Sequence, residues 1–253
     1  MFDPRPIRER HRGDLRRHVS VGVVLGLLAL SPAMAADDEG DACKIWHDFK
    51  TGGPFVPDLI EIRMNGDIGP EMENQLFGLL QDHLTTYPSL KTIKILLSSG
   101  GGFVESGFRI HNYLRGLHQR HGLQVVTHNT ATVQSAAVDV YCSGNQRIAS
   151  PYSVFMIHDS SRDIDGEFDV AAIKDFAEED ELGTIASHSI FSACTTVPIN
   201  DVDAMFAKQT YFDPDMALEL GLAHSITPAT YDRAADIRCL IDVTEPLAKD
   251  PEE

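Results

Sequence analysis

The sequence predicts an α/β domain built on a mainly parallel sheet with crossover helices. Short apolar strands alternate with amphipathic helices along most of the chain, and this alternation is typical of such folds. The first strand is expected at residues 59–64, where apolar and polar residues alternate before an Asn-Gly-Asp turn. A helix is expected at 71–87, because apolar residues recur there at a helical spacing and Pro88 follows.

The middle of the chain repeats this alternation. Residues 92–97 form an apolar run that predicts a strand, and a Ser-Ser-Gly-Gly-Gly segment follows at once. Residues 104–118 have the apolar spacing of a helix. The runs 123–127 and 153–157 are short and apolar, which favours buried strands, and the apolar stretch 136–142 between them favours a buried helix.

The last third of the chain is expected to be mostly helical. Residues 168–195 are strongly acidic but keep one apolar side at a helical period, so a long helix is predicted. Shorter helices are expected at 201–208 and 215–220, and Gly221 is placed as the C-terminal cap of the second. Short extended pieces are expected at 147–149, 223–226 and 240–243.

Residues 1–35 are typical of a signal peptide. Six arginines precede an apolar run at 19–30, and Ala33-Met34-Ala35 is a small-x-small cleavage site. The apolar run is shorter than the roughly 20 residues that span a bilayer. We therefore expect a periplasmic or secreted protein that begins near Ala36, and the alternative is a chain anchored to the membrane by an uncleaved leader.

The remaining chain is expected to be one domain with short flanking segments. Residues 36–58 form an acidic lead-in, 59–230 the α/β domain, and 231–253 a C-terminal extension with an acidic end. The formal net charge of -17 and the isoelectric point near 4.9 argue against nucleic acid and anionic membrane surfaces as partners.

Export bears on the four cysteines. In an oxidising compartment an even number allows two disulfides, with three possible pairings. Cys43 and Cys239 lie near the two ends of the mature chain, so one bridge between them would tie the termini. Cys142 and Cys194 lie in apolar helical stretches, where simple burial is the other possibility. No pair has C-x-x-C spacing, so no metal site is predicted.

Three groups with chemical potential each follow a predicted strand: Gly100 to Gly102, Ser135 and His158. Ligands of parallel α/β sheets bind at the carboxyl ends of strands, so the three groups are expected at one edge. Ser135 also precedes a helix, whose N-terminal amides can stabilise an oxyanion, although serine is equally a favoured N-cap. His158 is the candidate base for Ser135, and a purely structural histidine is the alternative.

The same residues resemble the proteolytic subunit of Clp protease, within the ClpP/crotonase fold of repeated ββα units. Leu97 to Val104 is similar to the family's oxyanion-loop motif, Asn-Ser-Pro-Gly-Gly-x-Val. Ser135 falls at the nucleophile position, with Gly144 nine residues on. Residues 151–158 match the Pro-x-x-x-x-Met-Ile-His run, and 217–226 resemble the closing Ala-x-x-x-Gly-Leu-x-Asp-x-Ile, so the likeness runs from about residue 59 to 226.

The resemblance implies a serine peptidase that needs no metal or other cofactor. Ser135 would attack the peptide carbonyl, His158 would take its proton, and amides of Gly101 or Gly102 and of Ala136 would hold the oxyanion. The family forms rings and receives substrate from a cytoplasmic ATP-driven unfoldase. An exported relative would assemble as a homo-oligomer without that unfoldase and act on peptides or unfolded segments.

The chain departs from the family pattern at three points. Ala131 replaces a glycine four residues before the nucleophile, and Gly100 replaces the proline of the oxyanion loop. An ungapped count places Met205 at the triad aspartate, whereas a slip of two residues restores Asp203, which is the expected acid.

Other readings of the same pattern remain open. A Clp-like pseudoenzyme would bind peptides or partners without cutting them, which the departures at the acid and at Ala131 favour. A crotonase-type enzyme would need an acyl-CoA site, and a structural envelope protein would not need Ser135 or His158 at all. Signal-peptide peptidases of this fold use a Ser-Lys pair, whereas the Met-Ile-His run favours the Clp-like branch.

Overall fold

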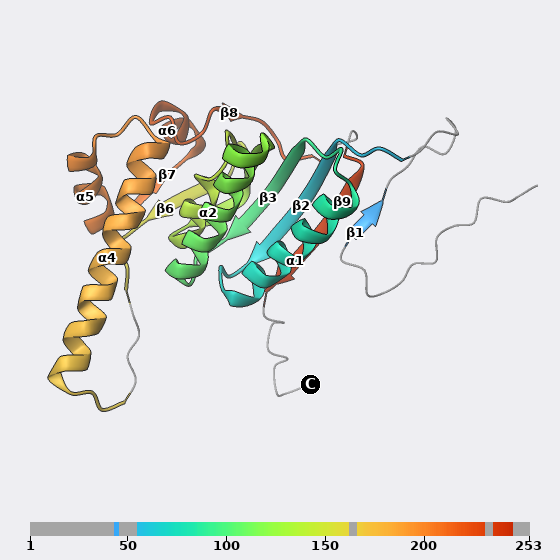
Figure 1. Ribbon diagram of the computed structural model, residues 1–253. Helices are drawn as coiled ribbons and strands as arrows, with labels where there is room; N and C mark the ends of the chain where they lie inside the picture. The colour runs from blue at the N-terminus through green and yellow to red at the C-terminus, as the bar shows by residue number, and fades with distance from the viewer. Residues whose placement is uncertain (1–42, 46–54, 162–165, 231–234, 245–253) are drawn as a thin grey trace, which may run out of the picture. The chain divides into compact units, whose positions relative to one another are not determined.

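The computed structural model describes residues 43–45, 55–161, 166–230 and 235–244, which belong to one compact unit spanning 40–253 (Figure 1). The expected signal peptide and its cleavage site lie outside the described residues. Within the described part of the chain, no helix combines the length and the apolarity needed to cross a membrane.

A mixed sheet with a parallel centre forms the body of this unit. Strands β2, β3, β4 and β5 are parallel neighbours, and the full path runs β1-β9-β2-β3-β4-β5-β8. Strand β6 pairs in parallel with the end of β4 and antiparallel with β7. The strands are β1 Cys43–Ile45, β2 Leu59–Gly66, β3 Thr92–Ser99, β4 Gln124–Gln134, β5 Gln146–Ala149, β6 Val154–Ile157, β7 Thr210–Phe212, β8 Ser225–Ile226 and β9 Ile237–Val243.

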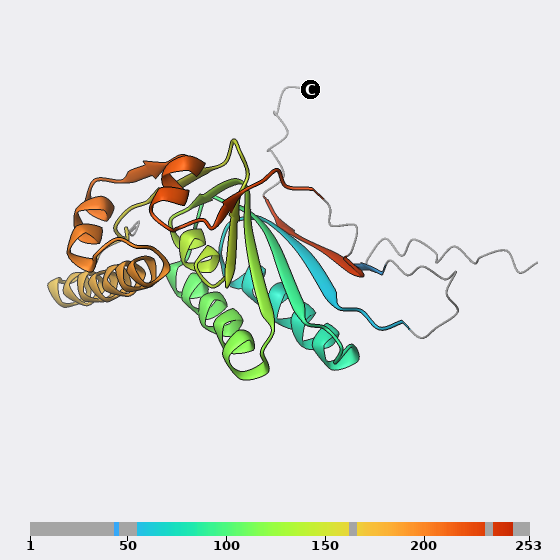
Figure 2. The same cartoon turned by 90° about the horizontal axis from the view of Figure 1, so that it is seen from above.

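The parallel strands are joined by crossover helices, as parallel pairing requires. Helices α1 and α2 lie side by side on one face of the sheet, as both views show (Figures 1 and 2). The helices are α1 Pro70–Thr86, α2 Val104–His121, α3 Ala136–Tyr141, α4 Val170–Cys194, α5 Ile199–Ala207 and α6 Pro214–Glu219. These bounds confirm the predicted α/β alternation.

The main core lies between the sheet and these helices. Because side chains alternate across a strand, Ile60, Ile62 and Met64 of β2 point to one face, where each is fully buried. Leu76 and Leu80 of α1, one turn apart, are fully buried as well. Burial of such apolar side chains contributes about 1.5–3 kcal/mol each and fixes the register of the strands that carry the site.

Strand β4 is longer than the sequence suggested. The predicted strand ended at residue 127, but β4 continues to Gln134, seven residues further. It pairs with β5 through Asn129 and then changes partner to β6 from Thr132 onward. The added length carries the chain to Ser135 at the rim of the sheet.

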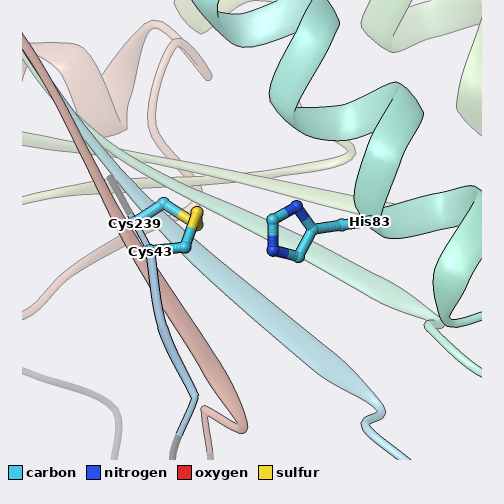
Figure 3. A group of neighbouring side chains, drawn as sticks. All are labelled: Cys43, His83 and Cys239. Atoms are coloured by element: carbon cyan, nitrogen blue, oxygen red, sulfur yellow. A yellow bond between two sulfur atoms is a disulfide. The ribbon is translucent and has the colours of Figure 1, made fainter. Parts of the chain in front are cut away.

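Two strands come from outside the expected domain boundaries. The lead-in contributes β1 and the C-terminal extension contributes β9, which pairs with both β1 and β2. Cys43 and Cys239 lie opposite each other in the antiparallel pair and form a disulfide, so this bridge ties the two ends of the described chain together. His83 of α1 faces the pair (Figure 3). Donor atoms of these three residues lie within 4.8 Å of one another, but the disulfide leaves no thiolate to bind a metal.

Candidate active site

Ser135 and His158 meet at the carboxyl edge of the sheet because their strands are parallel neighbours. Gln134 of β4 pairs with Met156 of β6, and the Ser135 N–H donates to the Met156 carbonyl at 2.8 Å. Ser135 and His158, which directly follow the ends of these two strands, therefore come together. Ser135 Oγ lies 2.9 Å from His158 Nε2. When the hydroxyl donates, Nε2 is the acceptor and the ring proton sits on Nδ1, which is the tautomer that a general base requires.

The backbone of Ser135 is held in an unusual conformation. Its φ of 52° and ψ of -130° place a non-glycine residue at positive φ, in a sharp turn between β4 and α3. Such a conformation costs of order 1–3 kcal/mol and persists where the surrounding structure enforces it, often at functional sites. Ser135 occupies the N-cap position of α3, but its side chain makes no capping hydrogen bond there. The hydroxyl is directed to His158 instead, which argues against the simple N-cap interpretation.

The glycine segment after β3 packs directly against this turn. Gly101 has φ of 106°, and a Cβ built on it would lie 2.6 Å from the Cβ of Ser135 and 2.9 Å from the Gln134 carbonyl. Gly102 has φ of 139°, and its Cβ would lie 2.2 Å from the carbonyl oxygen of Ile68. Only glycine fits at either position, because a side chain would collide with Ser135 or Ile68. The glycine backbone can therefore lie directly against the turn that carries the serine.

The amides of this segment differ in what they contact. The N–H of Gly101 donates to Ser99 Oγ at 3.1 Å, and its carbonyl accepts from the Ile68 N–H at 2.7 Å. For the N–H of Gly102, no hydrogen bond is found within the described ranges. The N–H of Ala136 belongs to the first turn of α3, where amides have no partner inside the helix. The amides of Gly102 and Ala136 are thus the ones available to hold an oxyanion, whereas the Gly101 amide already bonds Ser99.

A pocket of about 250 Å³ opens beside the serine. Its walls include polar groups from four segments and a few apolar side chains. The lining residues are Gly100, Gly102, Val104, Ser135, Ala136, Val138, Asp139, His158, Ser160, Ser161, Ser187 and Phe206. The expected site residues on the glycine segment, Ser135 and His158 therefore share one concave surface, as the sequence predicted.

Comparison with known proteins assigns this arrangement to a family. The family model for Clp protease matches residues 59–230, which is more than half of the chain. The chain belongs to the Clp protease family. Its similarity to individual members is distant, since ATP-dependent Clp protease proteolytic subunit 1 of Chlamydia felis is 27% identical over 146 residues, 56% of this chain and 68% of the relative.

Two further comparisons agree. Proteolytic subunit 2 of the same protease from Chlamydia abortus is 27% identical over 146 residues, 56% of this chain and 67% of that protein. A solved structure of a ClpP1 mutant from Listeria monocytogenes superimposes with a TM-score of 0.58 at 19% identity, over 67% of this chain and 91% of the other. At that identity the structural match supports the fold, which is the ClpP-like α/β fold expected from the sequence.

Within this Clp protease fold, Asp203 lies away from the position predicted for it. Its Oδ1 is 2.8 Å from Nδ1 of His188 on α4, and Nε2 of the same ring is 3.1 Å from Oδ1 of Asp159. His188 thus bridges α5 to the residue that follows His158. Within the described residues, no hydrogen bond joins Asp203 to His158, so any influence of this carboxylate on the base passes through His188 and Asp159.

Asp139 is the residue of the pocket that sequence reasoning missed. It lies on α3, its side chain is almost fully buried, and its Oδ2 accepts a hydrogen bond from Ser187 Oγ at 2.9 Å. Burial raises the pKa of this carboxyl to about 7, and the Ser187 hydroxyl partly opposes the shift. The only hint in the sequence was an acidic residue inside the otherwise apolar stretch 136–142.

The wall that carries Asp139 and Ser187 is fastened covalently. A disulfide joins Cys142, at the C-terminal end of α3, to Cys194, the last residue of α4. Arg147 reinforces the same region, because its guanidinium donates to the carbonyls of Cys194 and Gly221 at 2.7 and 2.9 Å. The two cysteines are therefore bridged rather than simply buried, and α3 and α4 are held together behind the pocket.

Proposed function

We propose that this chain is a serine peptidase in which Ser135 is the nucleophile and His158 the general base. The observation that carries the proposal is the 2.9 Å contact between Ser135 Oγ and His158 Nε2, formed at a strained turn beside two available amides. Family membership supports hydrolysis of peptide bonds as the reaction class.

The reaction follows from these positions. Ser135 Oγ attacks the substrate carbonyl carbon while His158 Nε2 accepts the hydroxyl proton. The carbonyl oxygen becomes an oxyanion, which the N–H groups of Gly102 and Ala136 stabilise. His158 then donates the proton to the leaving amine as the C–N bond breaks, which leaves an acyl group on Ser135. A water molecule deprotonated by His158 attacks the acyl carbon, releases the carboxylic acid and regenerates the serine.

Asp203 acts in this proposal as a positioning residue. Its carboxylate holds His188, and His188 holds Asp159, the residue next to the base. The absence of a carboxylate on His158 itself, within the described residues, is also the observation that favours the rival function, a peptide-binding pseudoenzyme. A serine-histidine pair without an orienting acid retains part of the catalytic power of a full triad, so a slow peptidase is the expected outcome.

We also propose that the protein acts outside the cytoplasm. The features of residues 1–35 support export to the periplasm or the medium, where ATP and a cytoplasmic unfoldase are not available. The substrates are then peptides or unfolded segments that enter the site unaided. Family membership supports a homo-oligomer. N-terminal sequencing of the protein recovered from the periplasm tests export, and a chain that retains residues 1–35 there would favour the anchored alternative.

Labelling with a fluorophosphonate probe tests the reactive serine. We expect the purified protein to be labelled, and we expect labelling to disappear in Ser135→Ala and in His158→Ala. Ser189→Ala and His121→Ala are matched controls, because they remove an exposed hydroxyl and an exposed imidazole outside the pocket. Loss of labelling in only the first pair supports the proposal, whereas a folded protein that is never labelled supports the pseudoenzyme.

A further inference from the structure

The pocket beside Ser135 contains a buried carboxylate that the proposed reaction does not use. Asp139 is only 3% exposed, yet it is among the residues that line the cavity. Its Oδ2 accepts from Ser187 Oγ, and within the described ranges no partner is found for Oδ1. One hydroxyl donor is little compensation for a carboxylate removed from water. The pocket therefore favours a ligand that brings a positive charge or hydrogen-bond donors to this oxygen.

Among the described residues that line the cavity, no other carboxylate is present to take that role. The twelve lining residues include no lysine or arginine, and His158 is the only other titratable side chain among them. The ring of His111 on α2 donates to the backbone carbonyl of Asp139 at 2.8 Å. Within the described residues, no hydrogen bond joins that ring to the Asp139 carboxylate. A cation that enters the pocket would therefore meet the Asp139 carboxyl group, which has no lysine or arginine partner among the described lining residues.

The lining of the pocket suits a long basic side chain. Asp139 follows Ser135 by four residues, so it lies about 6 Å further along α3. Val104, Val138 and Phe206 supply apolar surface along the pocket. Lysine and arginine carry a charged head on a stem of three or four methylenes, and such stems pack on apolar surface while the head remains solvated or paired.

We propose that this pocket receives the substrate side chain on the amino side of the scissile bond, and that Asp139 selects lysine or arginine there. This inference rests on the proposed peptidase function and names its substrate class. Asp139 would pair with the ammonium or guanidinium group, and Ser187 would hold the carboxylate in position. Acidic side chains would be rejected, because their charge would face Asp139 in a buried site.

Peptide substrates that differ only at this position test the inference. The wild-type protein is expected to cleave fluorogenic peptides with Lys or Arg there at least 10-fold faster, by kcat/KM, than the matched peptide with Leu. In Asp139→Asn, the Lys-to-Leu ratio of kcat/KM is expected to fall by roughly 30-fold or more, the scale expected when one partner of a buried charge pair is removed. Asp215→Asn removes an equal charge from an exposed site on α6 and should leave the ratio unchanged.

A second measurement needs no variant. Benzamidine carries a planar cation, and benzamide is its neutral counterpart of similar shape. Benzamidine is expected to slow fluorophosphonate labelling of the wild-type protein at concentrations where benzamide has no effect. Equal effects of the two compounds would overturn the role of Asp139 even if Asp139→Asn failed to fold.

The outcomes separate the two proposals. If Ser135 is labelled but Leu peptides are cleaved as well as Lys and Arg peptides, the specificity inference is overturned and the peptidase function stands. If the Lys-to-Leu ratio is the same in Asp139→Asn and in the wild-type protein, the selectivity arises elsewhere and the role of Asp139 is overturned. If a folded protein shows neither labelling nor cleavage, the function and the inference fail together.

Discussion

Oδ1 of Asp203 lies 2.8 Å from Nδ1 of His188, so the acid expected to orient the base contacts a different histidine. The second nitrogen of that ring contacts Asp159, which follows His158 directly in the chain. The carboxylate therefore acts on the base through two intermediate residues. Its energetic influence is expected to be smaller than that of an acid bonded to the catalytic imidazole.

The first prediction concerns this relationship. Asp203→Asn keeps a hydrogen-bond acceptor for His188 and is expected to lower kcat/KM less than about 10-fold, compared with about 10⁴-fold for an acid that holds the base directly. Steady-state cleavage of a single peptide by variant and wild type measures the difference. A loss of 10³-fold or more, in a variant whose Tm is unchanged, would mean that Asp203 orients His158 in the working enzyme.

The second prediction concerns the close approach of Gly101 to the nucleophile. Gly101→Ala introduces a methyl group that would lie 2.6 Å from the Ser135 Cβ, at a residue whose φ of 106° already disfavours any side chain. The clash displaces Ser135 from His158, so we expect the rate of fluorophosphonate labelling to fall at least 100-fold, since small misplacements of reacting groups cost that much.

Gly100→Ala is the matched control for this substitution. Nothing lies within 4 Å of a Cβ built on Gly100, and its φ is outside the positive range. The neighbouring variant should therefore keep both its labelling rate and its Tm. Equal losses in the two variants would show that the segment tolerates no change at all, and the argument from the Gly101 contact would fail.

The third prediction separates the two disulfides. Closing a loop with a disulfide typically stabilises a fold by about 2–4 kcal/mol, so removing either pair should lower the free energy of unfolding on that scale. Cys142 and Cys194 fasten α3 to α4 behind the pocket, whereas Cys43 and Cys239 join the edge strand β1 to its neighbour β9. We expect the Cys142→Ala, Cys194→Ala double variant to lose labelling as well as stability.

The Cys43→Ala, Cys239→Ala double variant serves as the comparison. Its labelling rate should match the wild-type rate at temperatures well below its Tm, because β1 and β9 contribute no residue to the pocket. Urea unfolding and labelling rates measured on the same samples distinguish stability from site geometry. An equal loss of labelling in both double variants would contradict the local role of the Cys142–Cys194 bridge.

The sequence singled out Ser135 and His158 because each follows a predicted strand, although the strand before Ser135 was expected to end at residue 127. Parallel pairing then brought both residues to one edge, and the register of Gln134 with Met156 fixed their separation. Asp139 escaped prediction for the opposite reason. Its role depends on Ser187, 48 residues away on another helix, and one acidic residue within an apolar stretch does not by itself reveal that partner.

The contacts of Asp203 were beyond the sequence for the same reason. Counting along the motif gives a position in the chain, whereas the partner of a carboxylate depends on how α4 and α5 pack. The pairing of β1 with β9 was also hidden, because a three-residue strand has too short an alternation to be recognised. The disulfide between Cys43 and Cys239 was suggested only by their positions near the two ends.

The last prediction uses the ionisation of Asp139. Burial raises the pKa of this carboxyl to about 7, so in the free protein it is neutral at pH 5.5 and charged at pH 8.5. Only the charged form pairs with a cationic side chain. The Lys-to-Leu ratio of kcat/KM is therefore expected to rise with pH through about 7 and then level off, since kcat/KM reports the pKa values of the free enzyme. A pH effect that acts on both substrates alike cancels in the ratio.

The raised pKa of Asp139 also makes the free energy of unfolding depend on pH. Because the folded-state pKa is raised, the proton stabilises the fold fully below about pH 4, and this contribution is lost as pH rises to about 7. Asp139→Asn should abolish the pH dependence of the ratio and flatten the fall in the free energy of unfolding between those limits. A ratio in the wild-type protein that is constant from pH 5.5 to 8.5 would show that Asp139 does not bind the substrate's charge.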